Sequence, residues 1–183
     1  MKTLQTIFLA LLLSTFSSAY AGDCFKDMDA ADCRVKAEQG NANAQFNLGL
    51  MYNNGLDAIQ DYKEAVKWYR LAAEHGNGEA QSNLGLMYDK GQGVVQDYKE
   101  AVKWYRLAAE QGVAIAQSNL GIMYLLGQGV VQDYVMAHMY CNIAGASGNE
   151  SAIKNRGIVG KMMTPSQIEK AQDLAREWMK RHP

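Results

Sequence analysis

Small and apolar residues recur through most of the chain at the three- and four-residue spacing of amphipathic α-helices. In the stretch from Asn43 to Tyr52, one helical face collects Ala44, Leu48, Met51 and Tyr52. The turn sequence Asn-Asn-Gly comes next and predicts the end of this helix, because glycine suits the backbone conformation that follows many helix ends.

A second helix is predicted to begin at Asp61 and to end near Gly76. Asp61 and Glu64 have the spacing of a capping pair, in which each side chain accepts a hydrogen bond from a backbone N–H group at the helix start. The aromatic pair Trp68 and Tyr69 is expected to lie in the core. The helix carries a continuous apolar face, formed by Ala65, Val66, Trp68, Tyr69, Leu71 and Ala72.

These two helices form a unit of 36 residues that the chain repeats. Residues 37–72 and 73–108 agree at 26 of 36 positions, and residues 109–144 match the second copy at 21 of 36. A period of this size, built from helix pairs, indicates a solenoid. Of the 17 glycines, 13 fall into four repeat columns, and two of these columns lie at predicted helix ends. One column lies inside a helix, where we expect close approach of the paired helix: Gly49, Gly85, Gly121 and Gly157.

Both ends of the array depart from the repeat, as the terminal units of a solenoid must. Residues 22–36 are predicted to form an N-terminal capping helix segment, and residues 145–183 a partial repeat with a C-terminal capping helix. In the third copy, positions that are charged in the second become Val135 and Met139. We therefore expect Leu174 and Trp178 of the last helix to cover this face.

The first 21 residues have the layout of a secretory signal peptide. Lys2 precedes the apolar run Ile7–Leu13, and Ala19 and Ala21 supply small residues at the positions that a signal peptidase reads. A buried N-terminal helix is the alternative interpretation. Cleavage near Ala21 would give a secreted or periplasmic protein, with no membrane insertion of the mature chain, since the apolar run is shorter than the ~20 residues of a membrane-spanning helix.

The repeated unit resembles the Sel-1-like repeat family, a relative of the tetratricopeptide repeats. The resemblance rests on Ala44-x-x-x-Leu48-Gly49-x-x-Tyr52-x-x-Gly55, followed by Ala65-x-x-Trp68-Tyr69-x-x-Ala72-Ala73-x-x-Gly76. It implies an all-α fold, a right-handed α/α superhelix of antiparallel helix pairs. It also implies that the concave face, lined by the first helix of each pair, binds proteins or peptides.

Neither the net charge nor the sequence motifs indicate nucleic-acid binding, a metal site or catalysis. The 18 basic and 19 acidic residues nearly cancel, which gives no electrostatic reason to expect nucleic acid. His75, His138 and His182 lack the spacing of a metal site, so we expect neither a metal nor a cofactor. Ser151 and Lys154 fit a Ser-x-x-Lys motif, but its companion motifs are absent.

The three cysteines give the redox context. Cys33 and Cys141 occupy the same repeat position three units apart, about 30 Å if each unit adds about 10 Å, which is beyond disulfide reach. Cys24 and Cys33 are therefore the predicted disulfide, which suits an oxidising compartment. Cys141 is predicted to be a buried free thiol.

The candidate peptide-binding residues are positions on the first helices that vary from repeat to repeat. The apolar position filled by Leu50, Leu86 and Ile122 lies on the same face and is included. Gln45 and Asn47, which recur in every copy, are instead expected to bond inter-repeat backbone, with ligand contact as the alternative. Leu125 and its neighbour Leu126 equally suit packing against the C-terminal segment. The candidates are Asn43, Phe46, Leu50, Asn53, Glu79, Ser82, Leu86, Asp89, Ile115, Ser118, Ile122 and Leu125.

The sequence thus predicts an exported, monomeric, non-catalytic scaffold or adaptor that binds a protein or peptide on its concave face. One alternative is a weak hydrolase of lactam or cell-wall substrates, as described for cysteine-rich relatives in the family. A second alternative is a structural component of an envelope assembly.

Overall fold

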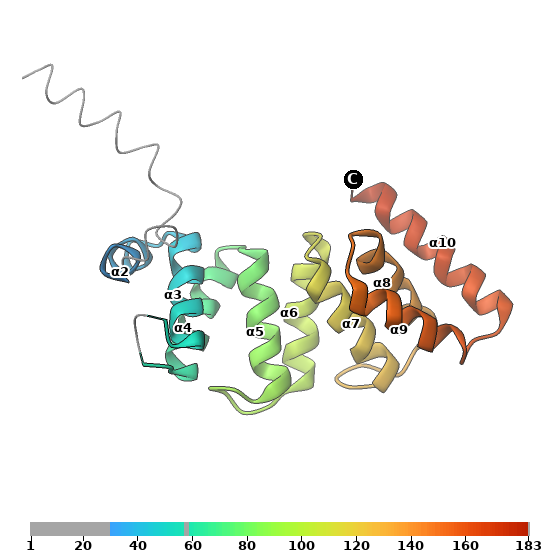
Figure 1. Cartoon of the computed structure of the whole chain (residues 1–183), viewed down its shortest axis with the longest axis horizontal. Coiled ribbons are helices and arrows are strands. Elements are labelled where there is room, and N and C mark those ends of the chain that lie inside the picture. Colours follow the sequence, from blue (N-terminus) through green and yellow to red (C-terminus); the bar gives the residue numbers. More distant parts are fainter. Residues whose placement is uncertain (1–29, 57–58, 183) are drawn as a thin grey trace, which may run out of the picture.

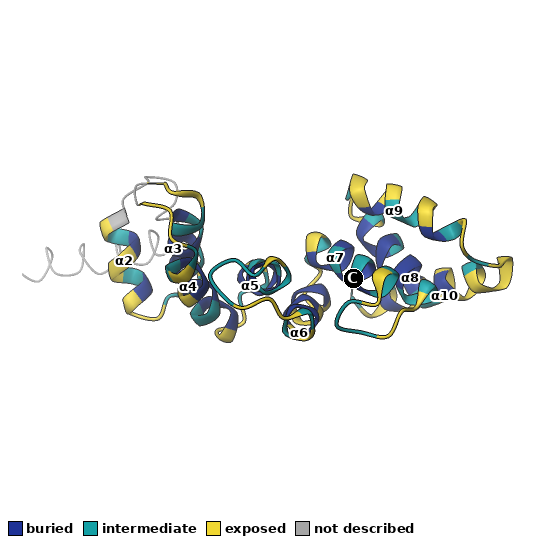
Figure 2. Cartoon of the chain, turned by 90° about the horizontal axis from the view of Figure 1, so that it is seen from below, coloured by how far each residue is buried: buried dark blue, intermediate teal, exposed yellow. Residues whose placement is uncertain are grey.

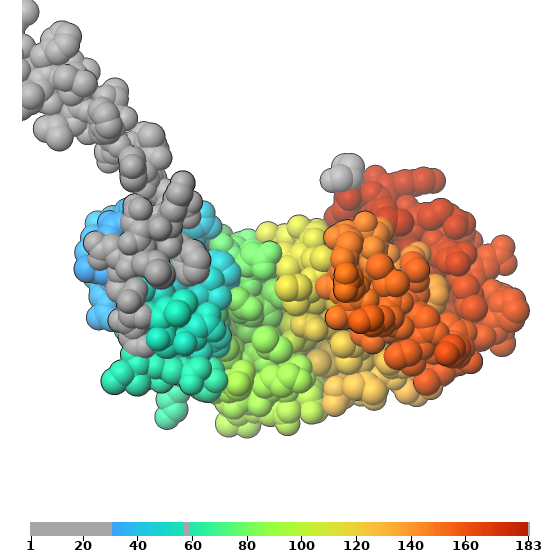
Figure 3. Space-filling view, in the orientation of Figure 1, coloured from blue at the N-terminus to red at the C-terminus, as the bar shows by residue number. Residues whose placement is uncertain are grey.

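The computed structural model describes residues 30–56 and 59–182, and within these residues the chain is helical without a β-strand. The helices follow one another along the long axis of an elongated body (Figures 1 and 3). They are α2 (Ala30–Glu38), α3 (Ala42–Asn54), α4 (Tyr62–Glu74), α5 (Gly78–Lys90), α6 (Tyr98–Glu110), α7 (Ala114–Leu126), α8 (Tyr134–Ala146), α9 (Glu150–Gly160) and α10 (Pro165–Arg181).

The helices pack as a solenoid of antiparallel pairs, which confirms the predicted all-α fold. The pairs α3/α4, α5/α6 and α7/α8 are the three repeats, and each second helix also packs against the first helix of the next repeat. The buried face of every helix points toward its neighbours in the stack (Figure 2). Trp68 and Tyr69 are buried, at 8% and 1% exposure, so their expected place in the core is confirmed.

Side-chain caps define most helix starts. The Asp61 side chain accepts from the backbone N–H groups of Lys63 and Glu64, and Asp97 and Asp133 repeat this. The second half of the expected capping pair is wrong: the Asp61 N–H group donates to the Tyr52 carbonyl, and the Glu64 carboxylate pairs with Lys67. The expected helix-ending glycines are confirmed, since those after α3, α5 and α7 adopt left-handed backbone conformations.

The in-helix glycines mark close contacts between paired helices in all three repeats. A Cβ atom on Gly49 would lie 2.5 Å from the Tyr69 ring, and one on Gly121 would lie 2.9 Å from Cys141 Sγ. Gly157 differs, because a Cβ there would meet nothing within 4 Å. The expectation of a close helix is therefore wrong at Gly157, since the following helix, α10, packs against α8 instead.

A ladder of buried glutamines joins successive repeats. The Gln45 side chain donates to the Ala37 carbonyl at 3.1 Å, and Gln81 and Gln117 make the equivalent bonds to Ala73 and Ala109. These bonds confirm the expected structural role of the glutamines, in which a buried amide satisfies backbone at the end of the preceding helix. Asn47 is buried at 9% exposure.

The second end of this ladder is incomplete in the third repeat. Gln45 Oε1 lies 3.0 Å from His75 Nδ1, and Gln81 Oε1 accepts from Gln111 at 2.8 Å. The residue aligned with His75 and Gln111 is Ser147, which is too short to reach. Gln117 Oε1 is accordingly buried without a hydrogen-bond partner among the described residues.

Ser147→His is expected to raise the free energy of unfolding by about 1 kcal/mol, because it would pair Gln117 Oε1 as His75 pairs Gln45 Oε1. Residue 114 is alanine, like the aligned Ala42 of the first repeat, and in that repeat the buried glutamine pairs with a histidine. Histidine therefore suits position 147 better than glutamine. The measurement is the urea midpoint of the helical circular dichroism signal. Ser147→Ala is the control, and equal midpoints for the two variants would contradict the prediction.

The C-terminal helix covers the third repeat. Met139 on α8 is 5% exposed and belongs to one apolar cluster with Ala175 and Trp178 of α10, against which Leu174 also packs. This confirms the expected cover for Met139, whereas Val135 is half-buried and does not belong to this cluster. The expected capping box of α10 is also present, since Thr164 and Gln167 exchange both hydrogen bonds.

The predicted signal peptide (1–21) and Cys24 lie outside the described residues. Cys33 is fully buried. Its pairing with Cys24 stays a prediction. Cys141 is a buried free cysteine, as predicted.

Candidate functional site

The structure distributes the twelve predicted binding residues over the first helices of the three repeats, α3, α5 and α7. Asn43, Glu79 and Ile115 are exposed near the helix starts. The half-buried residues run along the same helices: Phe46, Leu50, Asn53, Leu86, Asp89, Ile122 and Leu125.

The prediction is wrong for Ser82 and Ser118, which are buried at 4% exposure each. Their repeat position faces the neighbouring helices. In the first repeat it is filled by Phe46, whose ring lies 6.1 Å from that of Tyr69 and packs against the α4–α5 core. The small serine side chains allow the helices to close over this position, so it offers nothing to a partner.

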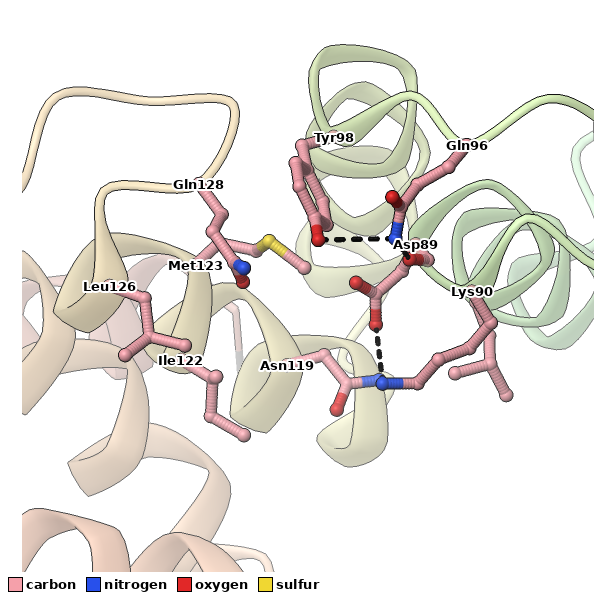
Figure 4. Close-up of a pocket in the computed structure, with 10 residues that line it drawn as sticks. Asp89, Lys90, Gln96, Tyr98, Asn119, Ile122, Met123, Leu126 and Gln128 are labelled. Atoms are coloured by element: carbon pink, nitrogen blue, oxygen red, sulfur yellow. Dashed lines mark hydrogen bonds and ion pairs between the residues drawn. The ribbon is translucent and has the colours of Figure 1, made fainter.

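A cavity of about 380 Å³ lies between α5 and α7. It brings together three of the predicted residues, Leu86 and Asp89 from α5 and Ile122 from α7 (Figure 4). Residues from the same helices and from the adjoining loops and start of α6 complete the lining: Lys90, Gln96, Tyr98, Asn119, Met123, Leu126 and Gln128.

Sequence reasoning treated most of these additional residues as framework. Gln96, Tyr98 and Asn119 have the same residue type in every full repeat, so variation within the repeat could not single them out. Gln96 precedes α6, Tyr98 begins α6 and Asn119 lies on α7, so the stacking of two repeats brings them to one cavity.

Asp89 is the carboxylate of this cavity. Its side chain is 14% exposed and lies 3.3 Å from Lys90 Nζ, whose own side chain is 60% exposed. Gln96 fixes the surrounding loop, because its amide donates to the Asp89 carbonyl at 2.7 Å and to the Tyr98 hydroxyl at 3.1 Å. In Figure 4 the Asp89 carboxylate lies between Tyr98 and Asn119.

The charge of this carboxylate acts on the buried Tyr105 hydroxyl. Tyr105 is fully buried, and its hydroxyl has no partner at hydrogen-bond geometry among the described residues. Burial raises the pKa of Tyr105, the negative charge of Asp89 raises it further, and the adjacent Asn119 side chain acts in the opposite direction. The Tyr105 hydroxyl is therefore in a poorly hydrated environment, in which the charge of Asp89 acts strongly.

The surface becomes apolar toward the C-terminal end. Ile115 is 59% exposed and Leu126 is 56% exposed. In the partial fourth repeat, Ile158 and Met162 occupy the positions of Ile122 and Leu126, and they are 49% and 53% exposed. These two residues are missing from the sequence-based candidates, although the 36-residue period would have identified them.

The structure adds no support for nucleophilic catalysis. Ser151 and Lys154 are exposed on α9 and do not line the α5–α7 cavity. Burial raises the pKa of the Cys141 thiol to about 11, which keeps it protonated at neutral pH. Burial, followed by the charge of Arg156, lowers the pKa of His138. Among residues 30–56 and 59–182, no group of three or more His, Cys, Asp or Glu side chains could hold a metal ion.

Comparison with known proteins assigns the fold to a family. A family model described as the Sel1 repeat matches residues 42–77, 78–113 and 114–149. The chain is a member of the Sel1 repeat family. The matches have the predicted period and begin five residues after the predicted repeat boundaries. Sel1 repeats form scaffolds that generally serve protein–protein interaction.

Solved structures of other Sel1-repeat proteins resemble this one. A Sel1 repeat protein from Oxalobacter formigenes is 41% identical, with a TM-score of 0.63 over 69% of this chain and 96% of that one. The protective antigen c5321 of uropathogenic Escherichia coli, which displays an SLR fold, is 30% identical, with a TM-score of 0.65 over 82% of this chain. This Sel1-repeat chain spans only 40% of that longer protein.

A third structure is cysteine rich protein B of Helicobacter pylori, which is 25% identical with a TM-score of 0.53 over 68% of this chain and 95% of that one. No curated protein matches the chain. Across the described part of this Sel1-repeat protein, no helix is both long and apolar enough to cross a bilayer.

Proposed function

We propose that this Sel1-repeat protein is an exported scaffold that holds a protein or peptide partner in the groove formed by α5, α7 and α9. The observation that carries the proposal is the cavity between α5 and α7, because it is lined by side chains from two successive repeats. Such a surface exists only when the repeats are stacked, so it fits a binding role for the solenoid as a whole.

The groove combines a polar part with an apolar part. Asp89, Gln96 and Asn119 offer hydrogen-bonding groups, Ile122 adds an apolar side chain, and the aligned Ile158 on α9 is exposed. A partner segment with apolar side chains on one side and a donor group at one end would match both parts. Because packed helices hold the lining in place, binding would order few protein groups and lose little conformational entropy.

Export is the second part of the proposal. Lys2, the apolar run Ile7–Leu13 and the small residues up to Ala21 support it. N-terminal sequencing of the mature protein from fractionated cells tests this part. A mature protein that keeps its first 21 residues in the cytoplasm would contradict export and leave the groove unaffected.

Leu86→Glu and Ile122→Glu are each expected to weaken partner capture at least about tenfold, because either change places a carboxylate in the apolar part of the cavity. The measurement is quantitative pull-down from an envelope extract with the immobilised protein, with folding checked by circular dichroism. Leu107→Glu is the matched control, since Leu107 is 44% exposed on α6 and does not line the cavity. Partners retained equally by all four proteins would contradict the groove.

A further inference from the structure

The chemistry of the α5–α7 cavity identifies the group that it receives, on the premise that the proposed groove is the docking surface. Position 89 is the feature that distinguishes this cavity from its repeat equivalents. The aligned residues are Asn53 in the first repeat and Leu125 in the third. The groove therefore carries a carboxylate at this position only where repeats two and three meet.

The internal partner of this carboxylate is weakly placed. Lys90 is the next residue in the chain, its side chain is 60% exposed, and its Nζ atom lies 3.3 Å from Asp89. A pair of this kind between a solvated lysine and a carboxylate contributes little to stability. Asp89 itself is 14% exposed. A ligand cation can thus replace Lys90 at small cost, and Lys90 then returns to water.

The rest of the lining fits a long side chain that ends in a planar cation. Leu86, Ile122 and Leu126 can contact an apolar stem, and Asn119 and Gln128 carry amide oxygens that accept hydrogen bonds. The ring of Tyr98 borders the cavity on the side of Asp89 (Figure 4). A flat guanidinium group can stack on such a ring and donate two parallel hydrogen bonds to one carboxylate.

We propose that the α5–α7 cavity is an arginine pocket: it receives an arginine side chain of the docked partner, whose guanidinium pairs with Asp89 while its methylene stem packs on Leu86 and Ile122. A carboxylate ligand would fit less well, because it would enter beside the negative charge of Asp89. A lysine would supply the charge but not the paired donors that the carboxylate can accept.

The test uses two synthetic peptides, acetyl-Leu-Ala-Arg-Ala-Leu-amide and its twin with citrulline in place of arginine. Citrulline has nearly the same shape but no charge, so the pair isolates the cation. The measurement is an NMR titration of the isotope-labelled protein, followed at the side-chain amide signals of Asn119 and Gln96. We expect the arginine peptide to bind about tenfold more tightly than the citrulline peptide.

Two variants assign the preference to this cavity. Asp89→Asn is expected to make the two peptides bind equally, and Lys90→Met to increase the affinity for the arginine peptide, because it removes the competing cation. Equal binding of both peptides by the unmodified protein, or a preference that survives Asp89→Asn, would overturn the arginine pocket. So would the absence of any shift at Asn119 and Gln96, or tighter binding of a third peptide with glutamate at the central position.

The outcomes also separate this inference from the proposed function. If both peptides shift the cavity signals equally, the groove stands and the arginine preference falls. If neither peptide shifts them, the arginine pocket is wrong, and the pull-down with Leu86→Glu decides the groove independently.

Discussion

Gly93→Ala is expected to lower the free energy of unfolding by about 3–4 kcal/mol, the largest effect of any single methyl group considered for this chain. Gly93 has φ +71°, a conformation that costs about 1–2 kcal/mol for a residue with a Cβ atom. In addition, that Cβ would lie 2.2 Å from the Tyr62 carbonyl oxygen and 2.9 Å from the Lys63 nitrogen. Both neighbours are backbone atoms at the start of α4, so relief requires the two repeats to move apart.

Gly112→Ala separates these two causes. Gly112 has φ +82°, but a Cβ there would meet nothing within 4 Å. It therefore carries the conformational cost alone and should lose about 1 kcal/mol. Urea unfolding followed by circular dichroism measures both variants, and losses of the same size would show that the contact with Tyr62 is unimportant.

The contact at Gly93 recurs at Gly129. Gly93 and Gly129 each lie against the start of the second helix of the preceding repeat, at Tyr62 and Tyr98. The first copy has Asp57 at the aligned position. The first helix pair is preceded by α2, which in the described residues begins at Ala30. Asp57 lies outside the described residues.

The features that the sequence predicted correctly are those repeated by the fold itself. Each repeat buries Gln45 or its equivalent in the same environment, so one physical argument applied to every copy. The cover over Met139 was predictable for a related reason: a lost charge in a repeated frame indicates a lost contact with water. In both cases comparison between copies supplied the information that a single helix would lack.

The same comparison failed where position in the stack matters more than residue type. Ser82 and Ser118 differ from Phe46, the residue at the same repeat position. This difference reflects packing between helices and not partner binding, since both serines are buried. Conversely, Gln96 does not vary but borders the cavity, where its amide donates to the Asp89 carbonyl and the Tyr98 hydroxyl. Which residues face a partner depends on the stacking of whole repeats. The hydrophobic pattern of a single helix does not reveal that stacking.

Gly85→Ala and Gly157→Ala are expected to change stability in opposite directions, although the two glycines occupy the same repeat position. A Cβ on Gly85 would lie 2.7 Å from the Tyr105 ring and 3.2 Å from the Ala101 carbonyl oxygen. Tyr105 is fully buried and cannot move aside without disturbing the core. The overpacking exceeds the helix-propensity gain of alanine, and we expect a net loss of about 2 kcal/mol.

At Gly157 the helix-propensity term acts alone. A Cβ there meets no atom within 4 Å, so alanine should stabilise α9 by up to about 1 kcal/mol through the lower conformational entropy of the unfolded chain. Thermal and urea unfolding of both variants measure the difference of about 3 kcal/mol between them. If Gly157→Ala also destabilises the protein, then a partner or segment packs closely on α9 in solution. If Gly85→Ala is neutral, then the approach of α5 to α6 is not what requires glycine in this column.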